Sequence, residues 1–214
     1  MQQQQTIQDA EQATPITAVK NKRFTTRKLA VTAMLAAVAT VLMFLSFNVP
    51  LMPSFIKLDL SELPALIAAF SMGPISGVVV CAVKNLVNLL FTTTGGVGEL
   101  SNFLLGVCFV LPAGIAYQFD KSRRGALVGS LVGVAFMAGL SVVTNYYVVY
   151  PVYTAFMPME TILEMYRVID PSVVTLWDAL VRFNLPFTAI KGGISVVITF
   201  LIYKSLSPVL KGRR

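Results

Sequence analysis

Long stretches without a charged residue constrain the fold of this chain more than any other feature. They cover residues 29–56, 63–83, 100–119 and 125–159. A helix needs about 20 mainly apolar residues to cross a bilayer, so several spans are available. Only 13% of the residues are charged and 56% are hydrophobic, whereas soluble domains carry about 25% charged residues. The chain is therefore predicted to be an all-α integral membrane protein.

Six helices are predicted, and the second is too short to cross a full bilayer alone. Gly73-Pro74 separates it from the third, because proline removes a backbone donor and disfavours helix at the residue before it. The chain length leaves room for one compact six-helix transmembrane bundle, a single membrane domain over residues 25–206. The predicted helices span residues 26–47, 62–72, 74–92, 98–119, 125–150 and 179–205.

The basic residues predict the orientation of the bundle. Twelve of the seventeen lysines and arginines lie in the segments 20–28, 121–124 and 204–214. The positive-inside rule then places both termini in the cytoplasm. The net charge of +7 is read as a topology signal and not as nucleic-acid binding, because the bases are split among short segments beside apolar helices. Residues 1–24 are predicted to be a disordered cytoplasmic tail and residues 207–214 a basic cytoplasmic tail.

Polar side chains lie on particular faces of the apolar helices. Asn184, Thr188 and Lys191 are spaced i, i+4 and i+7, which places them on one stripe of the last helix. A charge at the bilayer centre costs roughly 2.5–3.5 kcal/mol, so such groups need a partner or a ligand. We expect them to converge on one pocket in the outer half of the bundle. The expected polar pocket residues are Lys84, Asn85, Glu99, Asn102, Asn145, Tyr146, Asn184, Thr188 and Lys191.

Structural roles for the same residues stay open at this point. Asparagines and threonines in membrane bundles often bond across helices, for about 0.6 kcal/mol each. Lys84 and Glu99 could form an internal ion pair, and Tyr146 could belong to an interfacial aromatic belt. Lys191 has no acid at the right depth in its own helix, which favours a ligand or a water-filled cavity as its neighbour.

The segment 48–64 is predicted to form a lid over the outer mouth of the bundle. Its three prolines limit it to turns and extended pieces, yet it is too apolar for an ordinary outer loop. A lid with apolar and aromatic contacts to a flat ligand fits both facts. A re-entrant or interfacial segment without a ligand role is the alternative.

Several chemistries are excluded by residues that the sequence lacks. It contains no histidine, which excludes histidine catalysis and most zinc sites. It has no G-x-x-x-x-G-K-[ST] phosphate loop, so it is not itself an ATPase. Cys81 and Cys108 lie in predicted helices, where a lone thiol acts as a small hydrophobe. No catalytic residue, metal or cofactor is expected.

Small residues predict close helix contacts. Gly125, Gly129 and Gly133 repeat every fourth residue, which lets helices approach closely in lipid, and we expect this row to pack inside the bundle. Ala33 and Ala37 form a similar but weaker pair in the first helix.

Four runs together resemble the riboflavin-specific S components of energy-coupling factor (ECF) transporters. The runs are FIKLDLSELPALIA (55–68), KNLVNLL (84–90), GGVGELSNF (95–103) and NYYVVYPVYTAFMP (145–158). The resemblance covers about residues 25–206. It implies a multi-pass protein of the bacterial cell membrane that captures riboflavin from outside, between the loop after the first helix and the outer ends of the last three.

The resemblance also implies partners and a mechanism. The partners are a transmembrane coupling subunit (EcfT), contacted through Ala33 and Ala37, and two cytoplasmic ATPases. ATP hydrolysis would tip the bundle in the membrane and release the ligand inside. Riboflavin needs apolar walls, which Leu51, Phe55 and Phe103 could supply, and a few uncharged hydrogen-bonding groups, which fits the asparagines and threonine named above.

Three other functions stay open from the sequence. An S component for another vitamin or for FMN would use Lys84 or Lys191 against a phosphate. An ion-driven secondary transporter would need a proton-carrying acid such as Glu99, and the chain shows no internal repeat of the kind such transporters have. An intramembrane enzyme is disfavoured, because the membrane core lacks paired carboxylates and a serine beside a base.

Overall fold

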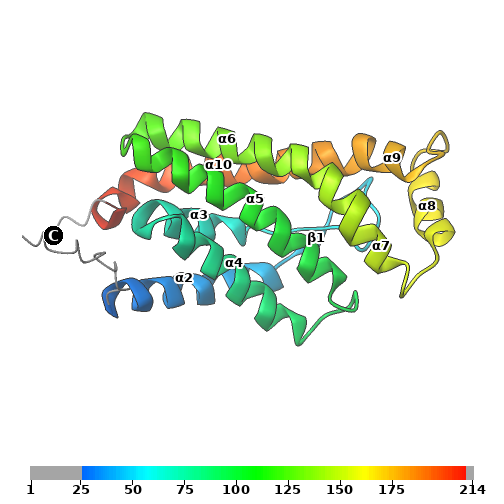
Figure 1. The fold of residues 1–214 in the computed structure, drawn as a ribbon, viewed down its shortest axis with the longest axis horizontal. Helices are drawn as coiled ribbons and strands as arrows, with labels where there is room; N and C mark the ends of the chain where they lie inside the picture. The colour runs from blue at the N-terminus through cyan, green and yellow to red at the C-terminus, as the bar shows by residue number, and fades with distance from the viewer. Residues whose placement is uncertain (1–25, 211–214) are drawn as a thin grey trace, which may run out of the picture.

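The computed structural model describes residues 26–210, and their side chains as far as residue 202. The helices form an elongated bundle in which α2 begins and α10 ends at the same end, with α8 at the opposite end (Figure 1). The predicted tail 1–24 lies outside the described residues. Of the predicted tail 207–214, the structure describes only the backbone of 207–210, as the last turn of α10.

Within residues 26–210, four helical segments are long and apolar enough to cross a membrane, which makes the chain a multi-pass membrane protein. Two of them contain a π-helical turn, η1 or η2, at the α8 end of the bundle. The four segments are α2 (Thr26–Phe44), α5 (Val97–Phe119), α6 (Arg123–Thr144) continued through η1 (Asn145–Val149) and α7 (Tyr150–Tyr153), and α9 (Leu176–Ala179) continued through η2 (Leu180–Asn184) into α10 (Leu185–Leu210).

Two shorter apolar helices complete the bundle, α3 (Glu62–Met72) and α4 (Pro74–Leu89). The break between them is at Gly73, whose φ of 104° lies in a region that favours glycine. Pro74 then occupies the first turn of α4, where its missing N–H costs no helical hydrogen bond. The predicted second helix, 62–72, is confirmed with these bounds.

The prediction of six helices is incomplete, because the outer segment contains more structure than expected. The first helix ends at Phe44, before the predicted residue 47, because the chain enters an antiparallel pair of short strands, β1 (Phe47–Asn48) and β2 (Lys57–Leu58). The sequence also did not reveal α8 (Met159–Arg167), which buries Ile162, Leu163 and Tyr166 and exposes its charged residues. These elements cover the end of the bundle opposite the start of α2 (Figure 1).

The glycine row of α6 packs inside the bundle, as the sequence predicted, and two of its members, Gly129 and Gly133, lie against α5. A Cβ atom at Gly133 would lie 2.5 Å from the carbonyl oxygen of Phe109, and one at Gly129 would lie 2.8 Å from that of Ala113. Both distances are too short for a side chain, so glycine is required for this approach. The outward faces carry large apolar residues such as Met34, 69% exposed, which suits a lipid environment.

Candidate functional site

A cavity of about 280 Å³ lies between the outer loop and the ends of four helical segments. This is close to the lower end of the range for ligand pockets, about 300–1,000 Å³. Its walls come from the end of α2, the segment 55–59, the first turns of α5, the η1–α7 region and the η2–α10 region. Seven residues of the predicted site line it: Phe55, Glu99, Asn102, Asn145, Asn184, Thr188 and Lys191.

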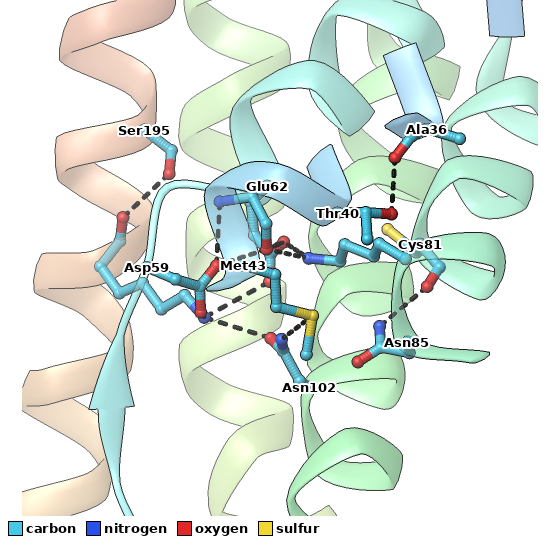
Figure 2. A network of polar contacts seen from close by, with 12 residues as sticks. Ala36, Thr40, Met43, Asp59, Glu62, Cys81, Asn85, Asn102 and Ser195 are labelled. Atoms are coloured by element: carbon cyan, nitrogen blue, oxygen red, sulfur yellow. Dashed lines mark hydrogen bonds and ion pairs between the residues drawn. The ribbon is translucent and has the colours of Figure 1, made fainter. Parts of the chain in front are cut away.

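Lys191 is the point at which three elements meet at this cavity. Its Nζ atom donates to Oδ2 of Asp59 at 2.9 Å and to Oδ1 of Asn102 at 3.1 Å, and lies 3.5 Å from Oε1 of Glu62. Figure 2 shows Asp59, Glu62 and Asn102 converging from the outer loop, α3 and α5. The sequence predicted a ligand or a water-filled cavity beside Lys191; Lys191 does line the cavity, and two carboxylates lie beside it as well.

Lys84 belongs to the same cluster and not to the cavity lining. Its Nζ atom forms an ion pair with Glu62 and donates to Oγ of Ser61 at 2.5 Å. The side chains of Lys84 and Glu62 are fully buried. The Lys84–Glu99 pair considered from the sequence does not form, because Lys84 pairs with Glu62 at the start of α3 and the Glu99 carboxylate bonds to Asn88, Thr92 and Thr94. Asp59, Glu62, Lys84 and Lys191, the buried charge cluster, together carry no net charge.

The buried charge cluster determines the ionisation of Asp59 in the outer loop. Burial alone would raise the pKa of this carboxyl, but the charges of Lys191 and Lys84 and a hydrogen bond from Ser61 outweigh burial and hold the pKa below its ordinary value. Asp59 is therefore ionised at neutral pH and fastens the loop to α10.

Glu99 faces the cavity from the first turn of α5 with uncharged partners. Its carboxylate accepts hydrogen bonds from Nδ2 of Asn88 at 2.9 Å, from Oγ1 of Thr92 at 2.9 Å and from Oγ1 of Thr94 at 3.3 Å. Hydrogen bonds to a carboxylate are stronger than hydrogen bonds between two neutral groups. These three bonds give both oxygens of Glu99 a partner. This arrangement holds the loop before α5 against the end of α4.

An aromatic group forms the opposite wall. The ring of Phe55 lies 5.6 Å from that of Tyr153 and 6.5 Å from that of Tyr150, measured between centroids. Beside them, Asn184 ends the π-helical turn η2 and bonds to the hydroxyls of Tyr150 and Tyr166. Asn145, at the start of η1, accepts a hydrogen bond from Ser101 at 3.3 Å. Single π-helical turns in α-helices occur frequently at functional sites.

Five residues of the predicted site lie outside the cavity lining. Lys84 is in the buried charge cluster, and Asn85 donates to the carbonyl oxygen of Cys81 within α4 at 2.8 Å. Leu51 is 76% exposed at a positive φ of 65°, and Phe103 packs against the core of the bundle. Tyr146 packs edge-on against Trp177 at 5.8 Å, and both side chains are exposed, as an aromatic belt would require.

The sequence reasoning missed Asp59 and Tyr150, which both line the cavity. The sequence does contain a signal for Asp59. The two lysines in apolar helices need two carboxylates as partners, and Asp59 and Glu62 lie close together at the end of the apolar segment 48–64. Within the part of the chain that the structure describes, no group of side chains could hold a metal ion.

The match to a known family decides what kind of protein has this cavity. Residues 27–203 match the family described as ECF transporter, substrate-specific component. The chain belongs to this family. Family membership makes the chain a component of a transporter and not an enzyme. It also excludes the alternative in which Glu99 carries protons for an ion-driven secondary transporter.

Individual relatives agree with the family. The chain is 33% identical over 185 residues to a protein named riboflavin transporter RibU from Staphylococcus aureus (strain TCH60), covering 86% of this chain and 93% of the relative. It is 34% identical over 191 residues to one named riboflavin transporter FmnP from Bacillus subtilis (strain 168), covering 88% of this chain and 96% of that relative.

A solved structure shares the fold. It is described as the S component of a bacterial ECF transporter and superposes with a TM-score of 0.69 at 32% identity, over 86% of this chain and 98% of that chain. The S-component fold therefore extends over the membrane domain described above.

Proposed function

We propose that this chain is the subunit that captures riboflavin from outside the cell for an ECF-type vitamin importer. The observation that carries the proposal is the chemistry of the cavity, which combines an aromatic wall with uncharged amide and hydroxyl groups. Riboflavin is a flat apolar ring system with an edge of donors and acceptors and a chain of hydroxyls. Relatives of similar length are named riboflavin transporters, which supports this ligand.

The proposed contact residues are those of the predicted set that line the cavity. Phe55 would stack on the ring system, while the amides of Asn102, Asn145 and Asn184 and the hydroxyl of Thr188 would meet its polar atoms. A ligand that left these buried groups unpaired would bind more weakly, which is the source of specificity. Riboflavin is then the transported ligand and not a cofactor.

The buried charge cluster favours riboflavin over its phosphate ester, FMN. The two lysines that the sequence offered to a phosphate, Lys84 and Lys191, are already neutralised by Glu62 and Asp59. A phosphate at Lys191 would have to displace Asp59. Lys57 also borders the cavity, but its side chain is exposed at the rim.

The proposed topology has six crossings, with α3 and α4 joining the four long segments, and both termini in the cytoplasm. The common end at which α2 begins and α10 ends supports an even number of crossings (Figure 1). The basic segments near both ends of the chain support the cytoplasmic side. The cavity would then open outward under a lid that contains β1, β2 and Phe55.

The proposed partners are a transmembrane coupling subunit (EcfT) and two cytoplasmic ATPases in the bacterial cell membrane. The chain itself has no phosphate loop, so the energy for inward release has to come from other subunits. Ala33 and Ala37 lie on the exposed face of α2, opposite its buried residues, which suits a helix contact with the coupling subunit.

Titration of the purified, ligand-free protein in detergent tests the proposed ligand. We expect riboflavin to bind with quenching of its fluorescence, FMN to bind more weakly, and thiamine not to bind. Thr188→Val removes one cavity hydroxyl and is expected to weaken riboflavin binding about three- to tenfold. Thr144→Val is the matched control, because Thr144 bonds to its own helix outside the cavity. Fluorescence that is unchanged by the wild-type protein would refute the ligand.

A further inference from the structure

Three side chains from separate elements form a closed hydrogen-bonded ring beside the cavity. Tyr166 of α8 donates its hydroxyl hydrogen to Oδ1 of Asn184 at 2.7 Å, and Nδ2 of Asn184 donates to the hydroxyl of Tyr150 at 3.3 Å. The two tyrosine hydroxyls bond to each other. Asn184 and Tyr150 line the cavity, whereas Tyr166 lies behind them and is fully buried.

The positions of the Asn184 amide atoms fix the direction of this ring, since the oxygen lies at Tyr166 and the nitrogen at Tyr150. Tyr166 has one hydroxyl hydrogen, which goes to Asn184, so it must accept the hydrogen of Tyr150. The 2.7 Å contact has the length typical of an O–H···O bond, about 2.7–2.8 Å, which agrees with the carbonyl oxygen of Asn184 facing Tyr166. Each hydroxyl hydrogen is thereby used inside the ring.

The ring leaves one hydrogen-bond donor of the Asn184 amide unused. Its amide has two N–H groups, and the ring uses one of them, so one N–H donor remains for a group in the cavity. Loss of the Tyr166 hydroxyl would remove the hydrogen bond that holds the amide oxygen toward α8. Burial raises the pKa of the Tyr166 hydroxyl well above its ordinary value, so this donor stays protonated at neutral pH.

We propose that Tyr166, which lies outside the cavity, is the positioning residue that orients the Asn184 amide as a hydrogen-bond donor to the ligand. This inference rests on the proposed function, because it concerns the same cavity. It gives α8 a role in recognition: the helix carries Tyr166 to the back of the site, where its ring packs against Phe183 at 5.4 Å and Phe55 at 6.3 Å. Tyr166 acts through Asn184 and does not touch the ligand.

A double-mutant cycle with riboflavin as the probe tests this role. Tyr166→Phe keeps the ring packing and removes the hydroxyl, and we expect riboflavin affinity to fall about three- to tenfold, the effect of one neutral hydrogen bond. In the Asn184→Leu background, which has no amide to orient, Tyr166→Phe should change affinity less than twofold. A merely structural role would lower affinity by the same factor in both backgrounds.

Tyr147→Phe is the matched control, because Tyr147 is 70% exposed and lies outside the cavity; its affinity should equal that of the wild type. Equal losses for Tyr166→Phe in both backgrounds, or no loss in the wild-type background, would overturn the inference. If Tyr166→Phe does not yield folded protein, Tyr150→Phe opens the same ring, and its loss must also disappear with Asn184→Leu. Failure of the wild-type protein to bind riboflavin would instead refute the proposed function.

Discussion

At the scale of single residues, the four charges of the buried charge cluster are arranged in compensating pairs. Glu62 and Lys84 lie on neighbouring helices and are fully buried, and Asp59 and Lys191 lie beside them. Transfer of an unpaired ion from water into such a site costs several kcal/mol. The bundle therefore tolerates the cluster because each charge has a partner of opposite sign. Removal of one member should lower the free energy of unfolding more than removal of a whole pair.

Single and paired substitutions in the cluster separate these effects. Glu62→Gln and Lys84→Met should each lower the free energy of unfolding by about 3–5 kcal/mol, because each leaves a buried charge uncompensated. The combination Glu62→Leu with Lys84→Met should recover most of that loss. Thermal unfolding in detergent measures both. Glu160→Gln is the control, because its pair with Arg167 is exposed and contributes about 0–1 kcal/mol; a double variant no better than the singles would contradict the argument.

Residue spacing predicted part of the site well. The i, i+4, i+7 stripe of Asn184, Thr188 and Lys191 does line one cavity, because Asn184 ends the π-helical turn η2 and Thr188 and Lys191 follow it on the regular helix α10. The partner of Lys84 was not predictable in this way, because Glu62 lies on another helix and periodicity describes one helix at a time. The loop that delivers Asp59 has no period at all.

At the scale of elements, α5 and α6 approach each other closely because the glycines of α6 have no side chains at their contact. The glycine row of α6 was predicted to pack inside the bundle, and the carbonyl oxygens of Phe109 and Ala113 in α5 fill the space where its Cβ atoms would be. By contrast, α8 was missed, because a nine-residue amphipathic helix between polar turns gives only a short periodic signal.

Two alanine substitutions in α6 test the close approach. Gly133→Ala places a methyl group 2.5 Å from the Phe109 carbonyl oxygen, so we expect a loss of about 1–3 kcal/mol from overpacking. Gly139→Ala is the matched control, since no atom lies within 4 Å of its Cβ position. It should be neutral or stabilising by about 0.5–1 kcal/mol, as alanine favours helix. Equal melting temperatures for the two variants would show that α5 and α6 separate easily.

At the scale of the whole molecule, capture and transport should be separable. The cavity lies toward the α8 end, whereas the exposed alanines of α2 lie on the outside of the bundle. The sequence predicted a membrane bundle from its uncharged runs, and the residue runs of the family carried the functional prediction. The arrangement of the elements around the cavity needed the structure, because it depends on long-range contacts.

Bulky residues on α2 test this separation. Ala33→Trp with Ala37→Trp should leave riboflavin affinity within twofold of the wild type and abolish ATP-driven uptake in vesicles that contain the coupling subunits. Ala135→Trp on the exposed face of α6 is the matched control and should retain uptake. If the α2 variant transports as well as the control, the coupling subunit binds elsewhere.

The buried charge cluster has an electrical consequence. A unit charge carried through a membrane potential of 100 mV involves about 2.3 kcal/mol of work. The two lysines and two carboxylates move as one body whenever the bundle moves, and their charges cancel. The membrane voltage therefore does almost no net work on the cluster, so the chain can hold ions in its core without those ions making its motion sensitive to the voltage.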